Sequence, residues 1–188
     1  MAIGDLMLTI GIDPGLDGAA VALVDGVPIV WTITPTGKVR HGKGTRKVFD
    51  PAGMEWWFRR VCAEVYEAGA GEYEAPDFVA LEATEARPPK GRNACHSLGY
   101  SQGLWEGLLV AHRWPYEIVR AAEWLPKMTR GVPGKGTKDR TVLAARRLLP
   151  ALDLTRSARS SKPHDGLADA GLLGLWAYRQ GKPAGSNA

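Results

Sequence analysis

The chain has 188 residues, 45% of them hydrophobic, and a formal net charge of +4. This length suits one domain with its own core, and the absence of any apolar run of about 18 residues excludes a membrane-spanning helix. Cys62 and Cys95 are too few for a disulfide framework and lack metal-ligand spacing, so we interpret them as buried free thiols. The N-terminal residues lack the features of a secretion signal, which predicts a cytoplasmic protein, in a bacterium or a phage-infected host cell.

The positive charge is concentrated in two segments. Residues 129–162 contain nine Lys or Arg and only two acids, and residues 38–47 contain five basic residues and no acid. The rest of the chain is therefore net acidic. Basic surfaces around an acidic centre are typical of proteins that cut a polyanion with the help of cations, and a solvated basic face is the alternative.

The apolar pattern predicts an α/β protein. Strands are expected at 7–13, 19–24, 27–33, 78–82 and 116–120, and helices at 51–68, 94–111, 123–128, 138–149 and 162–180, the last with Ser161 as its cap. Turns at 17–18 and 25–26 indicate an antiparallel meander of the first three strands, and residues 36–47 form a loop or the end of a hairpin. We expect a mixed five-stranded sheet with helices on both faces, in one domain over residues 1–180 with a disordered tail at 181–188.

Four acidic residues occupy unusual positions in this pattern. Asp13 ends the first strand and Glu82 ends the strand FVALE, where a buried carboxylate is costly unless something compensates it. Asp165 and Asp169 are four residues apart and share one face of the last helix. If that face packs against the strand ends, four carboxylates meet and repel one another unless a cation neutralises them. Hard oxygen ligands favour Mg²⁺ or Mn²⁺ over zinc.

This acidic cluster predicts a metal site that hydrolyses a nucleic-acid phosphodiester. Two ions about 3.5–4 Å apart can clamp a phosphodiester, one activating the attacking water and the other stabilising the leaving oxygen. Ordinary alternatives are open for three of the acids: Asp13 as a turn former, Glu82 as a strand-end salt bridge, and Asp165 as a helix N-terminal acid favoured by the dipole. The joint placement of the four acids favours the metal site.

Three motifs resemble those of the RuvC-type Holliday junction resolvases of the RNase H-like superfamily. They are GIDPGLDGAA at the first strand, VALEATEARP at the fourth, and KPHDGLADAGLLGLWA at the last helix. The stretches SLGYSQGLWEGLL, GVPGKGTKD and AARRLLP are similar to the phage-type branch of that family. The resemblance implies an RNase H-like fold and an endonuclease of DNA recombination and repair that resolves four-way junctions by paired symmetric nicks. It also implies two Mg²⁺ ions per active site, with Mn²⁺ as a substitute, and no nucleotide cofactor.

Carried over to this sequence, the family pattern makes Asp13, Glu82, Asp165 and Asp169 both the metal ligands and the catalytic residues. The last two acids are four residues apart here and three apart in the bacterial members. Asp165 is therefore the weakest match, and His164 could contribute as a ligand or proton carrier, although a lone histidine is more often structural.

A second departure concerns the aromatic residue that bacterial members place three positions after the glutamate, where it stacks at the junction centre. This chain has Glu85 there. Tyr100 or Trp105 could take that role, with core packing the alternative for Trp105.

The resemblance also implies a homodimer, because two active sites related by a two-fold axis match paired cutting. Gly99, Gly103 and Gly107 form a stripe of small residues on one helix, which suits either close approach of a second copy or packing against the sheet. Phosphate contacts to branched DNA are expected from seven basic residues: Arg87, Lys90, Arg92, Arg130, Lys135, Lys138 and Arg140.

Other functions fit part of the pattern. Sugar-kinase and actin-like ATPases also end their first strand in an acid before a glycine-containing loop, but they need two such domains. A non-catalytic nucleic-acid-binding domain gains nothing from collected negative charge. A related nuclease that acts on forks, flaps or RNA–DNA hybrids stays open.

Overall fold

The computed structural model describes residues 6–67, 75–85, 91–157 and 159–181. A central sheet contains five strands: β1 (Leu8–Asp13), β2 (Ala19–Val24), β3 (Val27–Ile33), β6 (Phe78–Glu82) and β7 (Tyr116–Val119). Their order across the sheet is β3-β2-β1-β6-β7. The first three strands form an antiparallel meander, and β6 and β7 run parallel to β1.

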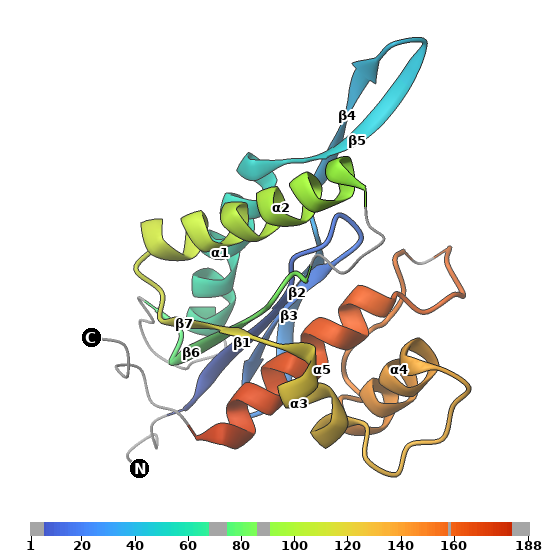
Figure 1. Cartoon of the computed structure of the whole chain (residues 1–188). Coiled ribbons are helices and arrows are strands. Elements are labelled where there is room, and N and C mark those ends of the chain that lie inside the picture. Colours follow the sequence, from blue (N-terminus) through green and yellow to red (C-terminus); the bar gives the residue numbers. More distant parts are fainter. Residues whose placement is uncertain (1–5, 68–74, 86–90, 158, 182–188) are drawn as a thin grey trace.

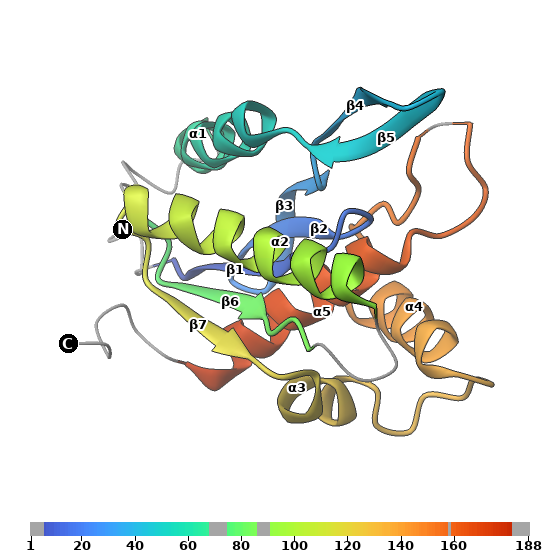
Figure 2. The ribbon, with the colours of Figure 1, turned by 45° about the horizontal axis from the view of Figure 1, so that its top comes forward.

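Five helices cover the sheet: α1 (Pro51–Glu67), α2 (Arg92–Ala111), α3 (Ala121–Met128), α4 (Thr137–Leu148) and α5 (Asp165–Gln180). Helices α1 and α2 lie over one face, and α3, α4 and α5 lie over the other (Figures 1 and 2). The predicted fold class, a mixed five-stranded sheet with helices on both faces, is confirmed. None of the helices in the described ranges is long and apolar enough to cross a membrane.

Strand alternation divides the core into two halves. Leu8, Ile10 and Ile12 of β1 are buried with residues of α1 and α2, including Trp57 and Trp105. The intervening residues of β1 therefore face α5, because successive side chains of a strand point to opposite faces. Burial of each large side chain contributes roughly 1.5–3 kcal/mol, so both halves hold their helices firmly against the sheet.

Helix α5 lies in backbone contact with β1. A Cβ atom on Gly11 would overlap the carbonyl oxygen of Ala170 and the amide nitrogen of Gly174. The hydroxyl of Thr9 donates a hydrogen bond to the carbonyl of Gly174 at 3.2 Å. Because Gly11 has no side chain, α5 can approach β1 closely. This close approach determines which side chains of α5 lie at the strand ends.

A separate hairpin projects from the body of the protein (Figure 1). It consists of β4 (Thr36–His41) and β5 (Gly44–Phe49), which pair only with each other in a two-stranded sheet. Gly42, in the two-residue turn, has φ of +57°, a conformation that glycine adopts without strain. Of the two possibilities for residues 36–47, the structure therefore has the hairpin.

The start of the last helix differs from the prediction. Helix α5 begins at Asp165, and its N-cap is His164 rather than Ser161. Pro163 pairs with Thr155 in an isolated β-bridge, and the amide of His164 donates to the carbonyl of Leu154 at 2.7 Å. These contacts hold the preceding residues in an extended conformation, which prevents an earlier helix start.

The other expectations have mixed outcomes. Cys62 and Cys95 are free thiols, but both are half-buried rather than buried. The single domain over 1–180 remains a prediction, and residues 182–188 of the expected tail lie outside the described residues.

Candidate active site

Asp13 and Glu82 lie next to each other at the ends of neighbouring strands. Strands β1 and β6 are paired in register up to Ile12 and Leu81, and each carboxylate follows directly after that pair. Alternation along each strand directs both side chains to the face that α5 covers, because the buried residues two positions earlier, such as Ala80, pack there. The parallel pairing that the sequence does not specify therefore brings these two acids together.

Asp169 approaches the same point from α5. It lies four residues after the helix start, on the segment that Gly11 allows to contact β1. Its Oδ1 atom is buried and has no hydrogen-bond partner among the residues that the structure describes. Such an unpaired buried oxygen is costly in a folded protein, and a functional role is one of the usual reasons that it persists.

Burial and mutual repulsion perturb these three carboxyl groups. Desolvation, followed by the nearby charges of Asp13 and Asp169, raises the pKa of Glu82 to about 8. Desolvation and the charge of Asp13 raise the pKa of Asp169 to about 7, and Thr141 and Lys138 oppose that shift. Burial also raises the pKa of Asp13. Groups that perturb one another in this way form one electrostatic cluster, which is characteristic of functional sites.

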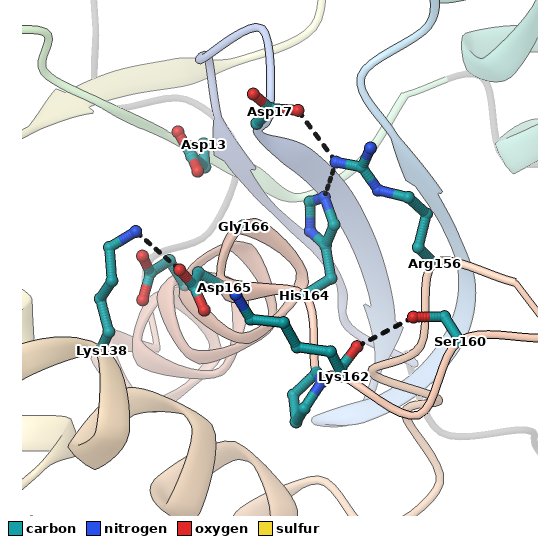
Figure 3. Close-up of a pocket in the computed structure, with 11 residues that line it drawn as sticks. Asp13, Asp17, Lys138, Arg156, Ser160, Lys162, His164, Asp165 and Gly166 are labelled. Atoms are coloured by element: carbon teal, nitrogen blue, oxygen red, sulfur yellow. Dashed lines mark hydrogen bonds and ion pairs between the residues drawn. The ribbon is translucent and has the colours of Figure 1, made fainter.

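Asp165 lies near Asp13 and Asp169 and its charge helps to raise their pKa values, but it is also paired with a cation. Its Oδ2 atom accepts a hydrogen bond from the Nζ atom of Lys138 at 2.7 Å, at the edge of a pocket of about 460 Å³ (Figure 3). Asp13 and Asp169 also line this pocket, whereas Glu82 does not, and we call it the carboxylate pocket. The ammonium group of Lys138 thus already compensates Asp165, and the pKa of Lys138 is raised by that contact.

His164 caps helix α5. Its Nδ1 atom accepts a hydrogen bond from the amide of Leu167 at 3.3 Å, and its Nε2 atom lies 3.2 Å from a guanidinium nitrogen of Arg156 (Figure 3). Burial, and then the charge of Arg156, lowers the pKa of His164. The contacts give this residue a structural role at the helix start, and its role as ligand or proton carrier stays a prediction.

Asp17 is a member of the pocket that the sequence did not single out. Its Oδ1 atom accepts hydrogen bonds from Lys47 at 2.8 Å and from Arg156 at 2.9 Å. These two ion pairs lower the pKa of Asp17. Since the partners are 30 and 139 residues away in the chain, only the tertiary structure links the turn after β1 to the hairpin and to the segment before α5.

The predicted DNA-contacting residues are not gathered in one place. Lys138 and Lys135 line a pocket with Asp165, whereas Arg130 lines another with Arg147 and Arg179. Arg140 is exposed on α4. Arg156 and Lys162, which were not among the predicted contacts, line the carboxylate pocket, and the density of basic residues at 129–162 was the only signal for them.

Three further predicted contacts cannot be placed. Arg87 and Lys90 lie outside the described residues. Arg92 begins α2, and the structure does not describe its side chain.

Helix α2 carries the glycine stripe and the two aromatic candidates. Among the described residues, a Cβ atom added at Gly99, Gly103 or Gly107 would meet nothing within 4 Å, so the stripe faces away from the sheet and does not pack against it. Trp105 is completely buried, as expected of a core residue, whereas Tyr100 is 52% exposed.

The chemistry of the carboxylate cluster suits a hard divalent cation. Asp13, Glu82 and Asp169 supply oxygen ligands only, and Oδ1 of Asp169 is without a partner. Within the described residues, however, no three His, Cys, Asp or Glu side chains form a group that could hold a metal ion as they stand. An ion would therefore require the carboxylates to turn toward a common point.

Comparison with known proteins gives no sequence match and a limited structural likeness. Neither a family model nor a curated protein sequence matches the chain. The Thermus thermophilus RuvC structure is similar with a TM-score of 0.47 and 19% identity, over 95% of this chain and 99% of that chain. T. thermophilus RuvC in complex with Holliday junction substrate is similar with a TM-score of 0.49 and 16% identity, over the same shares. Likeness at this level gives no evidence of activity, so a functional proposal rests on the residues of the site.

Proposed function

We propose that this protein is a structure-selective endodeoxyribonuclease that cuts four-way DNA junctions by metal-dependent phosphodiester hydrolysis. The observation that carries the proposal is the cluster of Asp13, Glu82 and Asp169, three half-buried carboxyl groups with raised pKa values from two strands and one helix. Such a cluster is unfavourable for folding because each negative charge raises the cost of the next. A bound cation that is coordinated by all three carboxylates is the best physical explanation for the cluster.

The proposed metal ligands are Asp13, Glu82 and Asp169, with Asp165 as a fourth once it is released from Lys138. Carboxylate oxygens select Mg²⁺, with Mn²⁺ as a substitute, and the four acids suffice for two ions. Bound there, the ions would lower the pKa of the attacking water and stabilise the charge that develops on the leaving oxygen. The carboxylates would then position the metal ions and need not transfer protons themselves.

Basic side chains at the pocket provide the contacts for a DNA strand. Lys138, Arg156 and Lys162 line the same pocket as Asp13 and Asp169. Cations at the rim attract a phosphodiester that the central carboxylates alone would repel. Asp17 and His164 hold Arg156 in place through its guanidinium group, so the rim is ordered before DNA binds.

We also propose a homodimer, since paired nicks on strands of like polarity need two sites related by a two-fold axis. The support is the stripe of Gly99, Gly103 and Gly107, which presents bare helix backbone to the solvent. A second helix can approach such a surface closely.

In the decisive experiment, the protein is incubated with Mg²⁺ and one end-labelled substrate at a time, and the cleavage products are analysed. The substrates are four-way junctions, forks, flaps, duplexes and RNA–DNA hybrids. Symmetric paired nicks in the junction are the expected result. Preferential cutting of forks, flaps or hybrids would replace the junction as substrate but keep the metal mechanism. Binding without cleavage of any substrate would show a non-catalytic binding domain, and heat of ATP binding by calorimetry would favour an ATPase.

A further inference from the structure

The β4–β5 hairpin is strongly basic and contributes nothing to either half of the core except at its base. Its exposed basic side chains are Lys38, Arg40, Lys43 and Arg46, and the hairpin contains no acidic residue. The apolar side chain of Val39 is also 46% exposed. A two-stranded hairpin with this composition is marginally stable by itself, so a binding role explains its retention better than a role in folding.

A second pocket lies at the base of the hairpin, against the first part of α2. It has a volume of about 240 Å³, and basic and aromatic side chains line it, among them Arg46, Lys47, Phe49, His96 and Tyr100; we call it the aromatic pocket. The rings of His96 and Tyr100 are one helical turn apart and parallel within 4°. Tyr100 also contacts the buried ring of Phe49, with the centroids 5.8 Å apart. This contact restricts the position of the Tyr100 ring.

Lys47, near the base of the hairpin, bonds to the loop that lines the carboxylate pocket. The Nζ atom of Lys47 donates to the carbonyl of Leu16 and to Oδ1 of Asp17, both at 2.8 Å. Leu16 lines the aromatic pocket, and the next residue, Asp17, lines the carboxylate pocket. The two pockets are therefore neighbours on either side of one loop.

From this arrangement we infer that the hairpin and the aromatic pocket bind a single-stranded segment of DNA. The basic side chains of the hairpin contact its phosphates, and one unpaired base stacks on the exposed face of Tyr100. Aromatic platforms beside a basic groove are the general means of binding unpaired nucleic acid, because every base has a flat face and every nucleotide a phosphate. A paired duplex offers the phosphates but not the base faces.

The choice of DNA rests on the proposed function, and the inference adds to it a preference for substrates with unpaired bases near the cleavage point. The consecutive residues Leu16 and Asp17 line the two pockets, so a base in the aromatic pocket would lie near the phosphodiester at the carboxylates, on the same strand or the strand next to it. Binding at the hairpin thus selects branched or locally opened DNA.

The test measures binding in EDTA, so that cleavage is not required. A fluorescein-labelled oligothymidylate of on the order of ten nucleotides, and a duplex of equal length, are titrated and followed by fluorescence anisotropy. We expect Tyr100→Ala to weaken binding of the single strand about tenfold while leaving duplex binding unchanged. Tyr100→Phe keeps the aromatic face and should bind like the wild type.

The hairpin charges are tested separately through salt dependence. Replacing Lys38, Arg40 and Lys43 together with Ser should reduce the slope of log affinity against log salt by about 2, as each lost phosphate contact removes about 0.7. The matched control replaces Arg59 and Arg60 with Ser and Arg113 with Asn, which removes the same charge from α1 and from the turn after α2.

Three results would overturn the inference: no single-strand binding by the wild type, wild-type affinity of Tyr100→Ala, or equal salt slopes for the hairpin variant and its control. Circular dichroism verifies that each variant is folded. If the protein binds single strands through Tyr100 but cuts no DNA, the proposed nuclease function fails and the hairpin site stands.

Discussion

The Nζ atom of Lys138 lies 2.7 Å from Oδ2 of Asp165, at the edge of the pocket that Asp13 and Asp169 line. An ammonium group here competes with a divalent cation for the same carboxylate oxygen, and it also favours the charged form of Asp169. The ion pair thus offsets part of the negative charge of the cluster. If a divalent cation took its place on Asp165, as we propose, Lys138 would be free to contact a DNA phosphate.

Removing the ammonium group of Lys138 tests its competition with a divalent cation for Asp165. Lys138→Gln should tighten Mn²⁺ binding about fivefold, which corresponds to roughly 1 kcal/mol, because Asp165 loses its competing cation. The same change should reduce DNA cleavage, because a phosphate contact is lost. Isothermal titration calorimetry measures the first effect and a junction cleavage assay the second. Lys138→Arg, which keeps the charge, is the matched control, and unchanged Mn²⁺ affinity in Lys138→Gln would contradict the competition.

Asp13→Asn, Glu82→Gln and Asp169→Asn should each reduce cleavage on the order of a thousandfold or more, since metal positioning supplies several kcal/mol of transition-state stabilisation. Junction binding should persist. Without metal these variants should also be more stable than the wild type, with a melting temperature higher by about 2–4 °C for each kcal/mol of repulsion removed. Glu67→Gln, an exposed acid at the end of α1, should change neither property. A variant that cleaves normally would remove its residue from the mechanism.

Stability should depend on pH in a direction set by the raised pKa values. In the folded protein Glu82 and Asp169 hold their protons up to about pH 8 and 7, whereas in the unfolded chain they release them near the ordinary pKa values of 4.5 and 3.8. Between these limits the folded state binds more protons, so the free energy of unfolding should fall as the pH rises from about 4 to about 8. Urea unfolding in EDTA measures this decline.

Two controls make the pH experiment specific to the cluster. Saturating Mg²⁺ should flatten the profile at neutral and alkaline pH, because the cation replaces the protons as the compensating charge. Glu82→Gln should remove part of the decline. A decline of the same size in Glu82→Gln would assign the effect to other groups.

The contact between β1 and α5 predicts a severe effect of one added methyl group. Gly11→Ala places a Cβ against the backbone of Ala170 and Gly174, so α5 must shift and carry Asp169 away from Asp13. We expect destabilisation by about 3 kcal/mol or more and loss of cleavage. Gly37→Ala adds the same group in open space on β4, away from the proposed dimer stripe, and should not destabilise the protein. Equal stability of the two variants in urea unfolding would contradict the close contact.

The proposed dimer is tested on the same helix. Gly103→Leu adds a bulky side chain where the structure has free space, so the fold of the monomer should be unaffected. If two copies meet along this stripe, the variant should dissociate at micromolar concentration in light scattering and lose paired cutting while single nicks continue. Trp56, a 60% exposed residue of α1, gives the control Trp56→Leu. A wild-type monomer with junction DNA present would remove the dimer.

Local patterns in the sequence predicted most of the elements and drew attention to three of the acidic residues. Short apolar runs bounded by turn residues predicted all five strands of the sheet, because strands that are buried on both faces are continuously hydrophobic. Asp13, Glu82 and Asp169 were identifiable for a similar reason: a carboxylate interrupts a pattern that is otherwise buried, and the interruption is visible without neighbours. The start of α5 was predicted too early because a β-bridge from Pro163 to Thr155, eight residues back, overrides the local helix signal.

Proximity was decided by the tertiary structure alone. Parallel pairing of β1 with β6 brings Asp13 beside Glu82, and the backbone contact at Gly11 brings Asp169 to both. The ion pairs of Asp17 with Lys47 and Arg156, and the aromatic pocket under the hairpin, join segments that no periodicity relates. The sequence by itself determined which carboxylates interrupt a buried apolar pattern, because the free-energy cost of burying a charge depends on the local element. The tertiary structure decided which of these carboxylates share a site. Long-range packing brings them together, and the spacing of residues in the sequence does not reveal the packing partners.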